Sequence, residues 1–171
     1  MSPNRPPRLA EFSYVGLYRY FVTICTNQRR TCFRDDEPAR WMTAQIEQAF
    51  EPRQFAVIAY CVMPDHVHLL LEALADDADF KSTMRHWKQT TGYAWKQRAR
   101  RRLWQEGYYD RVLRERDSDL DVVRYILDNP HRAGLTSDDE PYPYMGSSRF
   151  TMDQLSEAVG DWTPYDRSRR E

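Results

Sequence analysis

Two histidines separated by a single residue, His66 and His68, are the residues of this chain best suited to chemistry. They follow the turn-like segment Met63-Pro64-Asp65 and lie in an apolar, β-branched run that predicts a strand. Because residues two apart in a strand project from the same face, the two imidazoles converge on one point above the sheet. Imidazole binds several divalent cations, so the pair predicts a metal site. A pair that stands alone more often faces solvent or bonds to backbone, and this pair therefore needs partners elsewhere in the chain.

Tyr125 and Asn129 form a second candidate pair. They are four residues apart in a segment whose apolar residues recur with helical spacing, so they lie one turn apart on a single face. Pro130 restricts Asn129 and is expected to end the helix there. An amide oxygen is a hard ligand for a cation, and a tyrosine one turn back can present its hydroxyl to the same centre. Taken by itself, Tyr125 is better interpreted as a half-buried aromatic residue whose hydroxyl bonds a carbonyl.

The elements that must position these pairs follow from apolar periodicity and turn signals. In chain order they predict the pattern β-α-β-β-α-β-α. The short link at 63–65 makes the second and third strands an antiparallel hairpin. The expected strands are 19–26, 55–62, 66–73 and 108–114, and the first expected helix is 37–50. A second helix follows the acidic residues at 76–79 and extends as far as about 101, and a third is capped by Asp117 or Ser118 and ends at Asn129.

The second expected helix and the residues after it carry an unusual charge. No acidic residue occurs between Lys81 and Gln105, although basic and aromatic residues are frequent there. Basic groups neutralise phosphates and aromatic rings stack on unpaired bases, so the stretch predicts a local surface for single-stranded or hairpin nucleic acid. A solvated helix face is the alternative. The candidate DNA-binding residues are Arg85, Trp87, Lys88, Trp95, Lys96, Arg98, Arg100, Arg101 and Arg102.

Composition limits the remaining possibilities. A chain of 171 residues is most simply one domain, and its net charge of −1 excludes a globally basic nucleic-acid binder. Three cysteines without a C-x-x-C pair favour reduced thiols in a cytoplasmic protein. The N-terminal residues lack the apolar run of a signal peptide, and no stretch approaches the ~20 apolar residues of a membrane span. We expect a soluble, cytoplasmic and nucleoid-associated protein without a membrane partner.

The separated motifs closely resemble the REP-associated tyrosine transposases, which belong to the HUH single-tyrosine, or IS200-like, transposases. The resemblance rests on the His-hydrophobic-His strand, the Tyr-x-x-x-Asn-Pro helix and the phrases LWQEGYYDRVLR and YILDNPHRAGLT. It implies an α+β fold, a ferredoxin-like or RRM-like sandwich whose antiparallel sheet carries helices on one face, plus a C-terminal tyrosine-bearing helix. We expect an N-terminal tail at 1–13, the transposase domain at 14–150 and a C-terminal tail at 151–171.

The resemblance also implies roles for individual residues. Tyr125 matches the nucleophile, and His66, His68 and Asn129 match the residues that hold Mg²⁺ or Mn²⁺. The implied enzyme is a transposase that nicks single-stranded or hairpin DNA through a covalent 5′-phosphotyrosine and leaves a free 3′-OH for rejoining. Many relatives have histidine where this chain has Leu127, so no role is carried over to that position.

Three questions stay open at the level of sequence. The histidine pair is also compatible with a metal-dependent hydrolase that activates water, and the whole chain with a hairpin-DNA-binding protein that has no catalytic activity. The sequence does not decide whether the protein acts as a monomer or a homodimer.

Overall fold

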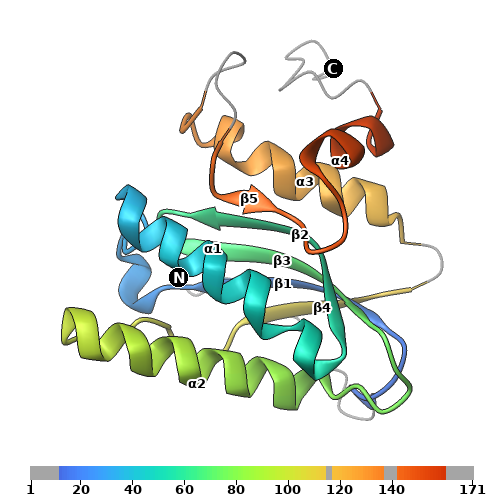
Figure 1. Cartoon of the computed structure of the whole chain (residues 1–171), viewed down its shortest axis with the longest axis horizontal. Coiled ribbons are helices and arrows are strands. Elements are labelled where there is room, and N and C mark those ends of the chain that lie inside the picture. Colours follow the sequence, from blue (N-terminus) through green and yellow to red (C-terminus); the bar gives the residue numbers. More distant parts are fainter. Residues whose placement is uncertain (1–11, 115–116, 137–141, 161–171) are drawn as a thin grey trace.

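A five-stranded sheet lies at the centre of the fold, as the computed structural model in Figure 1 shows for the residues it describes, 12–114, 117–136 and 142–160. The strand order is β4-β1-β3-β2-β5, and every neighbouring pair is antiparallel. The strands are β1 (Arg19–Cys25), β2 (Phe55–Met63), β3 (His66–Ala73), β4 (Tyr109–Leu113) and β5 (Met145–Gly146).

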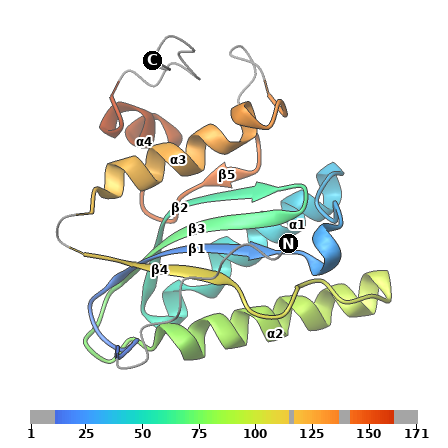
Figure 2. The ribbon, with the colours of Figure 1, turned by 180° about the vertical axis from the view of Figure 1, so that it is seen from behind.

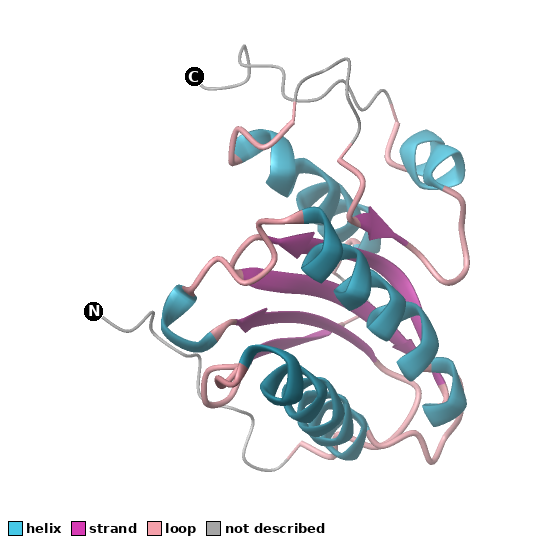
Figure 3. Ribbon diagram, turned by 60° about the vertical axis from the view of Figure 1, so that its left-hand side comes forward, coloured by secondary structure: helices cyan, strands magenta, loops and turns pink. Residues whose placement is uncertain are grey.

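Four α-helices and two short 3₁₀ helices connect and flank these strands in the described residues. The α-helices are α1 (Asp36–Ala49), α2 (Phe80–Ala99), α3 (Asp119–Arg132) and α4 (Met152–Ala158), and the 3₁₀ helices are η1 (Asn27–Arg29) and η2 (Glu51–Arg53). The helices form two layers on opposite faces of the sheet, which Figure 3 shows as cyan ribbons around magenta strands.

Alternation along the central strands assigns each side chain to one of these layers. In β1, Tyr20, Val22 and Ile24 are fully buried and belong to the apolar cluster beneath α1 and α2. The intervening residues face the opposite side, where α3 and α4 pack. In β3 the same rule sends Val67, Leu69 and Leu71 toward α1 and α2. His66 and His68 therefore share the face on which α3 lies.

Strand β2 is buried on both faces because α1 packs against one and α3 against the other, and a bulge within it changes its register. Val57 pairs with Leu71, and Ala59 pairs with Leu70, so one extra residue of β2 lies between these two pairs. After the bulge, Cys61 and Met63 face α3, whereas Tyr60 and Val62 face α1. This arrangement explains why the segment reads as a continuous apolar run rather than as an alternating one.

The predicted α+β fold with an antiparallel sheet is confirmed, and the expected strands and helices agree with the observed ones to within one or two residues at most ends. The prediction that the tyrosine helix ends at Asn129 is wrong. Helix α3 continues through Pro130 to Arg132, and the Ala133 N–H closes its last turn on the Asn129 carbonyl. Pro130 has no N–H to bond the Ile126 carbonyl, so the helix lacks that one hydrogen bond and continues beyond it for a few residues.

Two elements were not expected from the sequence. Strand β5 has only two residues, and α4 lies within the segment 151–171 that was assigned to a tail. Leu155 of α4 is buried in the same apolar cluster as Ile126 of α3. Thr151 begins α4 with a capping box, in which its hydroxyl and the Gln154 side chain each bond the other residue's backbone N–H.

None of the helices in the described part of the chain has the length and apolar character needed to cross a bilayer.

Candidate active site

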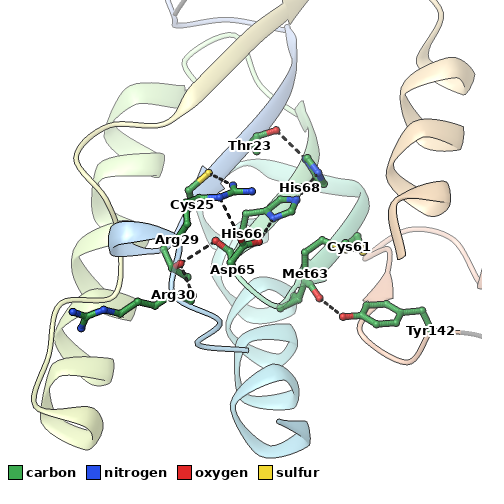
Figure 4. Close-up of polar contacts among 12 residues, drawn as sticks. Thr23, Cys25, Arg29, Arg30, Cys61, Met63, Asp65, His66, His68 and Tyr142 are labelled. Atoms are coloured by element: carbon green, nitrogen blue, oxygen red, sulfur yellow. Dashed lines mark hydrogen bonds and ion pairs between the residues drawn. The ribbon is translucent and has the colours of Figure 1, made fainter. Parts of the chain in front are cut away.

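The two histidines point toward one another from β3, as Figure 4 shows. The Nε2 atoms of His66 and His68 are 3.0 Å apart, and the ring planes are nearly perpendicular at 85°. Both side chains emerge on the α3 face of the sheet, as their two-residue spacing predicts. The convergence expected from the sequence is therefore confirmed.

A separate partner fixes the far side of each ring. The Nδ1 atom of His66 lies 2.6 Å from the Asp65 carboxylate, and the Nδ1 atom of His68 lies 2.9 Å from the hydroxyl of Thr23. Thr23 stands directly opposite His68 on β1, so strand register supplies this contact. The carboxylate accepts a hydrogen bond from the Nδ1–H of His66, and the Thr23 oxygen can accept one from the Nδ1–H of His68. With these tautomers, both Nε2 lone pairs face the same point.

The surroundings of both imidazoles favour their neutral form. Burial lowers the pKa of His68 to about 3, and the neighbouring His66 adds to this effect, while a hydrogen bond to Asn129 opposes it. Burial also lowers the pKa of His66, and the Asp65 carboxylate opposes that shift. A neutral imidazole offers a lone pair to a cation, so this environment prepares both side chains to act as ligands.

The loop after β1 holds Asp65 in place. Arg29 forms an ion pair with the Asp65 carboxylate at 2.9 Å, and the buried hydroxyl of Thr26 donates to the backbone carbonyl of Asp65 at 3.0 Å. Gln28 and Arg29 both adopt left-handed backbone conformations, with φ of 59° and 55°. Such conformations are costly for residues other than glycine, and the contacts of this loop maintain them.

Helix α3 carries the other two candidate residues to the histidines. Ser118 begins the helix by accepting a hydrogen bond from the Asp121 N–H. The buried stripe of α3 packs against Leu70 and the α3-facing side chains of β2. Tyr125 and Asn129 stand beside this stripe, and the Asn129 amide donates to the Tyr125 carbonyl at 2.6 Å. Leu127 is buried in the same cluster and takes no part in the site.

The Tyr125 ring lies next to the histidine pair. Its centroid is 5.5 Å from that of His68, and it meets the Phe21 ring edge-on at 5.7 Å. The Arg132 guanidinium lies 5.6 Å from the centre of the same ring. With 41% of its surface exposed, Tyr125 remains accessible to a large substrate. The structure thus brings together His66, His68, Tyr125 and Asn129.

The donor geometry of the histidine pair fits a divalent cation. Two nitrogens that each lie about 2.1 Å from one ion, at a right angle to each other, are about 3.0 Å apart. The measured separation of the two Nε2 atoms matches this value. No group of three or more His, Cys, Asp and Glu side chains suited to a metal occurs among the residues described. The amide oxygen of Asn129, which bonds His68, is the third donor that the site offers.

The candidate DNA-binding residues of α2 fall into two groups. Trp87 and Trp95 are 1% and 4% exposed and belong to the core under the sheet, so the prediction that their rings contact DNA is wrong. Their spacing on α2 matches the buried stripe of the helix, and packing accounts for them. The basic residues of the set are exposed except for Lys88, which is half-buried. These exposed residues are Arg85, Lys96, Arg98, Arg100, Arg101 and Arg102.

Several of these basic side chains have contacts within the fold. The Lys88 amine donates to the carbonyls of Gln105 and Gly107, and the Arg102 guanidinium donates to the Trp104 carbonyl. Arg98 forms an ion pair with Glu37. Lys88 and Arg102 thus fasten the segment that follows α2.

That segment runs back to the end of β1, next to the strand that carries the histidines. Trp104 pairs with Thr26, and the Gln105 N–H bonds the carbonyl of Cys25, which stands opposite His66. Burial raises the pKa of the Cys32 thiol, and the charges of Arg101 and Arg30 oppose this shift. Arg30 and Arg101, which are 71 positions apart in the sequence, thus both lie near this thiol.

Three residues of the site were not predicted from the sequence. Asp65 was assigned only to a turn, although its position directly before His66 is a local signal for a carboxylate that orients the ring. Thr23 reaches the site through strand pairing, and Arg29 reaches it through a left-handed loop. No local sequence pattern predicts either position.

Known proteins resemble this chain in sequence. Residues 14–129 match the family described as "Transposase IS200 like". The REP-associated tyrosine transposase of Escherichia coli K12 is 26% identical over 159 residues, which cover 92% of this chain and 94% of that protein. A Haemophilus influenzae protein whose name assigns it provisionally to the same transposases is 28% identical over 165 residues, which cover 89% of this chain and 90% of that protein.

A solved structure shares the fold. The structure of a REP-associated tyrosine transposase bound to a REP hairpin superposes with a TM-score of 0.69 at 22% identity, covering 100% of this chain and 98% of that one.

Proposed function

Because this chain belongs to the family of IS200-like transposases, an assignment that makes it an enzyme acting on DNA, we propose that it cleaves and rejoins single-stranded DNA with Tyr125 as the nucleophile. The observation that carries the proposal is the placement of the Tyr125 ring 5.5 Å from His68, whose Nε2 in turn lies 3.0 Å from that of His66. The Tyr125 phenol and the two imidazoles thus lie together on the α3 face of the sheet. This is the combination that phosphoryl transfer to tyrosine requires.

His66, His68 and Asn129 are the residues that would hold Mg²⁺ or Mn²⁺. When bound, a divalent cation draws charge from the non-bridging oxygens of a phosphodiester and reduces the repulsion that a nucleophile meets. The Asp65 carboxylate and the Thr23 hydroxyl keep the two imidazoles oriented with their Nε2 atoms together. Helix α3 contributes both Tyr125 and Asn129, so one rigid element sets the spacing between the nucleophile and the third donor.

The proposed reaction exchanges one phosphodiester for another. The Tyr125 oxygen attacks the scissile phosphorus and loses its proton, and the bond from phosphorus to the 3′ oxygen breaks. The 3′ oxygen takes up a proton and leaves as a free 3′-OH. Tyr125 then carries the 5′ phosphate of the other strand segment. Attack by a 3′-OH on this phosphotyrosine reverses the step and rejoins DNA without an external energy source.

The substrate we propose is single-stranded DNA that contains a hairpin. The solved structure with the same fold is bound to a REP hairpin, which supports this choice. Arg30 and Arg101 lie near each other beside Cys32 and offer positive charge to a DNA backbone. Lys96 and Arg85 extend positive charge along the exposed side of α2.

A denaturing gel tests the proposal. The protein is incubated with end-labelled single-stranded hairpin DNA, taken from palindromes that flank its own gene, and with Mn²⁺. The wild type, Tyr125→Phe and His66→Ala are compared, each with and without a chelator. We expect a covalent protein–DNA band only for the wild type with metal.

Other outcomes would overturn this proposal in distinguishable ways. Cleavage that survives Tyr125→Phe but not His66→Ala would point to a hydrolase in which the metal site activates water. Hairpin binding that is unaffected by chelator, with no cleavage at any metal concentration, would point to a binding protein without catalytic activity.

A further inference from the structure

Part of the sheet face next to Tyr125 has no helix over it in the residues described. Helix α3 packs chiefly against β2 and less against β3, and no helix lies in front of β1 and β4 when the molecule is seen from behind (Figure 2). Two aromatic side chains emerge there. Phe21 comes from β1, and Tyr109, which pairs with Thr23, comes from the edge strand β4.

These two rings continue outward from the nucleophile. The Phe21 ring meets the Tyr125 ring edge-on at 5.7 Å and stacks on His68 at 5.7 Å with an interplanar angle of 18°. On its other side, Phe21 contacts the Tyr109 ring at 6.3 Å. Tyr109 is 36% exposed, whereas Phe21 is half-buried. An unbroken row of rings thus leads from the candidate active site to solvent.

Packing alone does not account for Tyr109. The apolar clusters of both faces are complete without its ring, which is not among the residues that pack against them. An exposed aromatic side chain on an open sheet face is the means by which several nucleic-acid-binding domains hold unpaired bases, because every base has a face that can stack. Two arginines flank the row: Arg132 lies over the Tyr125 ring, and Arg111, which forms an ion pair with Asp117, stands opposite Phe21 on β4. Guanidinium groups in these positions suit the phosphates on either side of a stacked base.

We propose that Tyr109, backed by Phe21, stacks on the unpaired base next to the scissile phosphate. This inference rests on the proposed function, because it places a base of the same single-stranded substrate. A base on Tyr109 would lie one ring beyond Phe21, which itself touches the nucleophile. The sugar-phosphate that follows such a base reaches Tyr125 without a further nucleotide. Stacking at this point would fix which phosphodiester is presented to the phenol.

Fluorescence of 2-aminopurine tests this arrangement. The base analogue is placed in turn at each position flanking the cleavage site of a hairpin substrate, and its emission is followed on binding to the Tyr125→Phe protein in Mg²⁺. Tyr125→Phe keeps the ring but cannot form the covalent product, so the measurement reports binding alone. We expect strong quenching at one flanking position.

Variants of Tyr109 assign the quenching to this ring. Tyr109→Ala, made in the Tyr125→Phe protein, should abolish the quenching and raise the Kd about 10-fold, whereas Tyr109→Phe should preserve both. Tyr18→Ala is the matched control, since Tyr18 is 37% exposed at the far end of β1 and its ring contacts Tyr20 beneath the opposite face. Thermal unfolding of every variant checks that the fold is retained.

The result separates this inference from the proposed function. If no flanking position is quenched, or if Tyr109→Ala leaves both quenching and Kd unchanged, the stacking role is wrong even when the covalent band forms. If the quenching depends on Tyr109 but the wild type forms no covalent band, the stacking role stands and the nucleophilic function fails.

Discussion

The Asp65 carboxylate lies 2.6 Å from the Nδ1 of His66, on the opposite side of the ring from the Nε2 that faces His68. The carboxylate therefore fixes both the rotation of the ring and the position of its proton. Arg29 holds the carboxylate in turn at 2.9 Å. Asp65, which is not itself one of the proposed cation ligands, thus controls the orientation of one of the two nitrogens on which cation binding depends.

Asp65→Asn is expected to weaken binding of Mn²⁺ about 10- to 100-fold, because the amide no longer enforces a proton on the Nδ1 of His66. Isothermal titration of the metal into the protein, without DNA, measures this loss. Asp77→Asn, which makes the same change on an exposed loop residue, should leave the affinity unchanged. Equal affinities for Asp65→Asn and the wild type would remove Asp65 from the site.

Arg132→Gln is expected to reduce the rate of covalent adduct formation about 10-fold while changing DNA affinity less. Its guanidinium is a cation next to the Tyr125 ring, 5.6 Å from its centre, and favours negative charge where the phosphate arrives. Single-turnover kinetics on saturating hairpin DNA separates rate from binding. Arg124→Gln is the matched control, because Arg124 bonds Asp121 and the Val159 carbonyl instead. Equal rate losses in the two variants would contradict a specific effect of Arg132.

Trp87→Ala is expected to lower the free energy of unfolding by about 3–5 kcal/mol, because it removes a large buried ring from the core beneath the sheet. Denaturant unfolding monitored by circular dichroism gives the value. The exposed Tyr93 on the same helix provides the comparison, and Tyr93→Ala should change stability by about 0.5 kcal/mol or less. If Trp87→Ala left stability intact and weakened only DNA binding, the ring would be a DNA contact after all.

Tyr144→Phe is expected to make the protein less stable at pH 6 but to have a smaller effect near pH 3. Hydrogen bonds from Arg40 and then from Tyr144, the latter at 2.8 Å, lower the pKa of the Asp36 carboxyl below its usual range. Since the unfolded chain binds this proton more tightly, the ionised carboxylate stabilises the fold above about pH 4, and the contribution is lost as the pH falls through the folded pKa.

Unfolding midpoints at the two pH values measure this difference. Tyr142→Phe serves as the control, because the Tyr142 hydroxyl donates to the backbone carbonyl of Val62 and its loss should cost the same at both pH values. A Tyr144→Phe effect that is equally large at pH 3 would show that the hydrogen bond acts without the carboxylate charge.

Local signals in the sequence were enough to predict strands β1 to β4 and the histidine pair, but not β5 or the order of the strands in the sheet. Alternation along 19–26 and 66–73 determines which face each residue takes, so the convergence of His66 and His68 follows from spacing alone. Helical periodicity likewise placed Tyr125 and Asn129 on one face. These predictions hold because each depends on residues within a few positions of one another.

Features that depend on tertiary contacts were not predictable in the same way. Trp87 and Trp95 lie in a basic stretch that suggested a DNA surface, yet helical spacing alone could not reveal that their face packs under the sheet. Thr23 meets His68 only through strand register, across 45 positions. Helix α3 continues past Pro130, and the Ala133 N–H still bonds the Asn129 carbonyl. The general rule that proline ends a helix does not predict this.

The left-handed backbone at Gln28 and Arg29 destabilises this loop, although the loop holds the Asp65 carboxylate beside His66. Each such residue costs about 1–2 kcal/mol relative to an ordinary conformation, and glycine would remove most of that cost at either position. Glycine at 29, however, would also remove the guanidinium that holds Asp65. A search for more stable variants would therefore find this loop among its first targets, and the variant stabilised at position 29 would be the one whose histidine site is less well ordered.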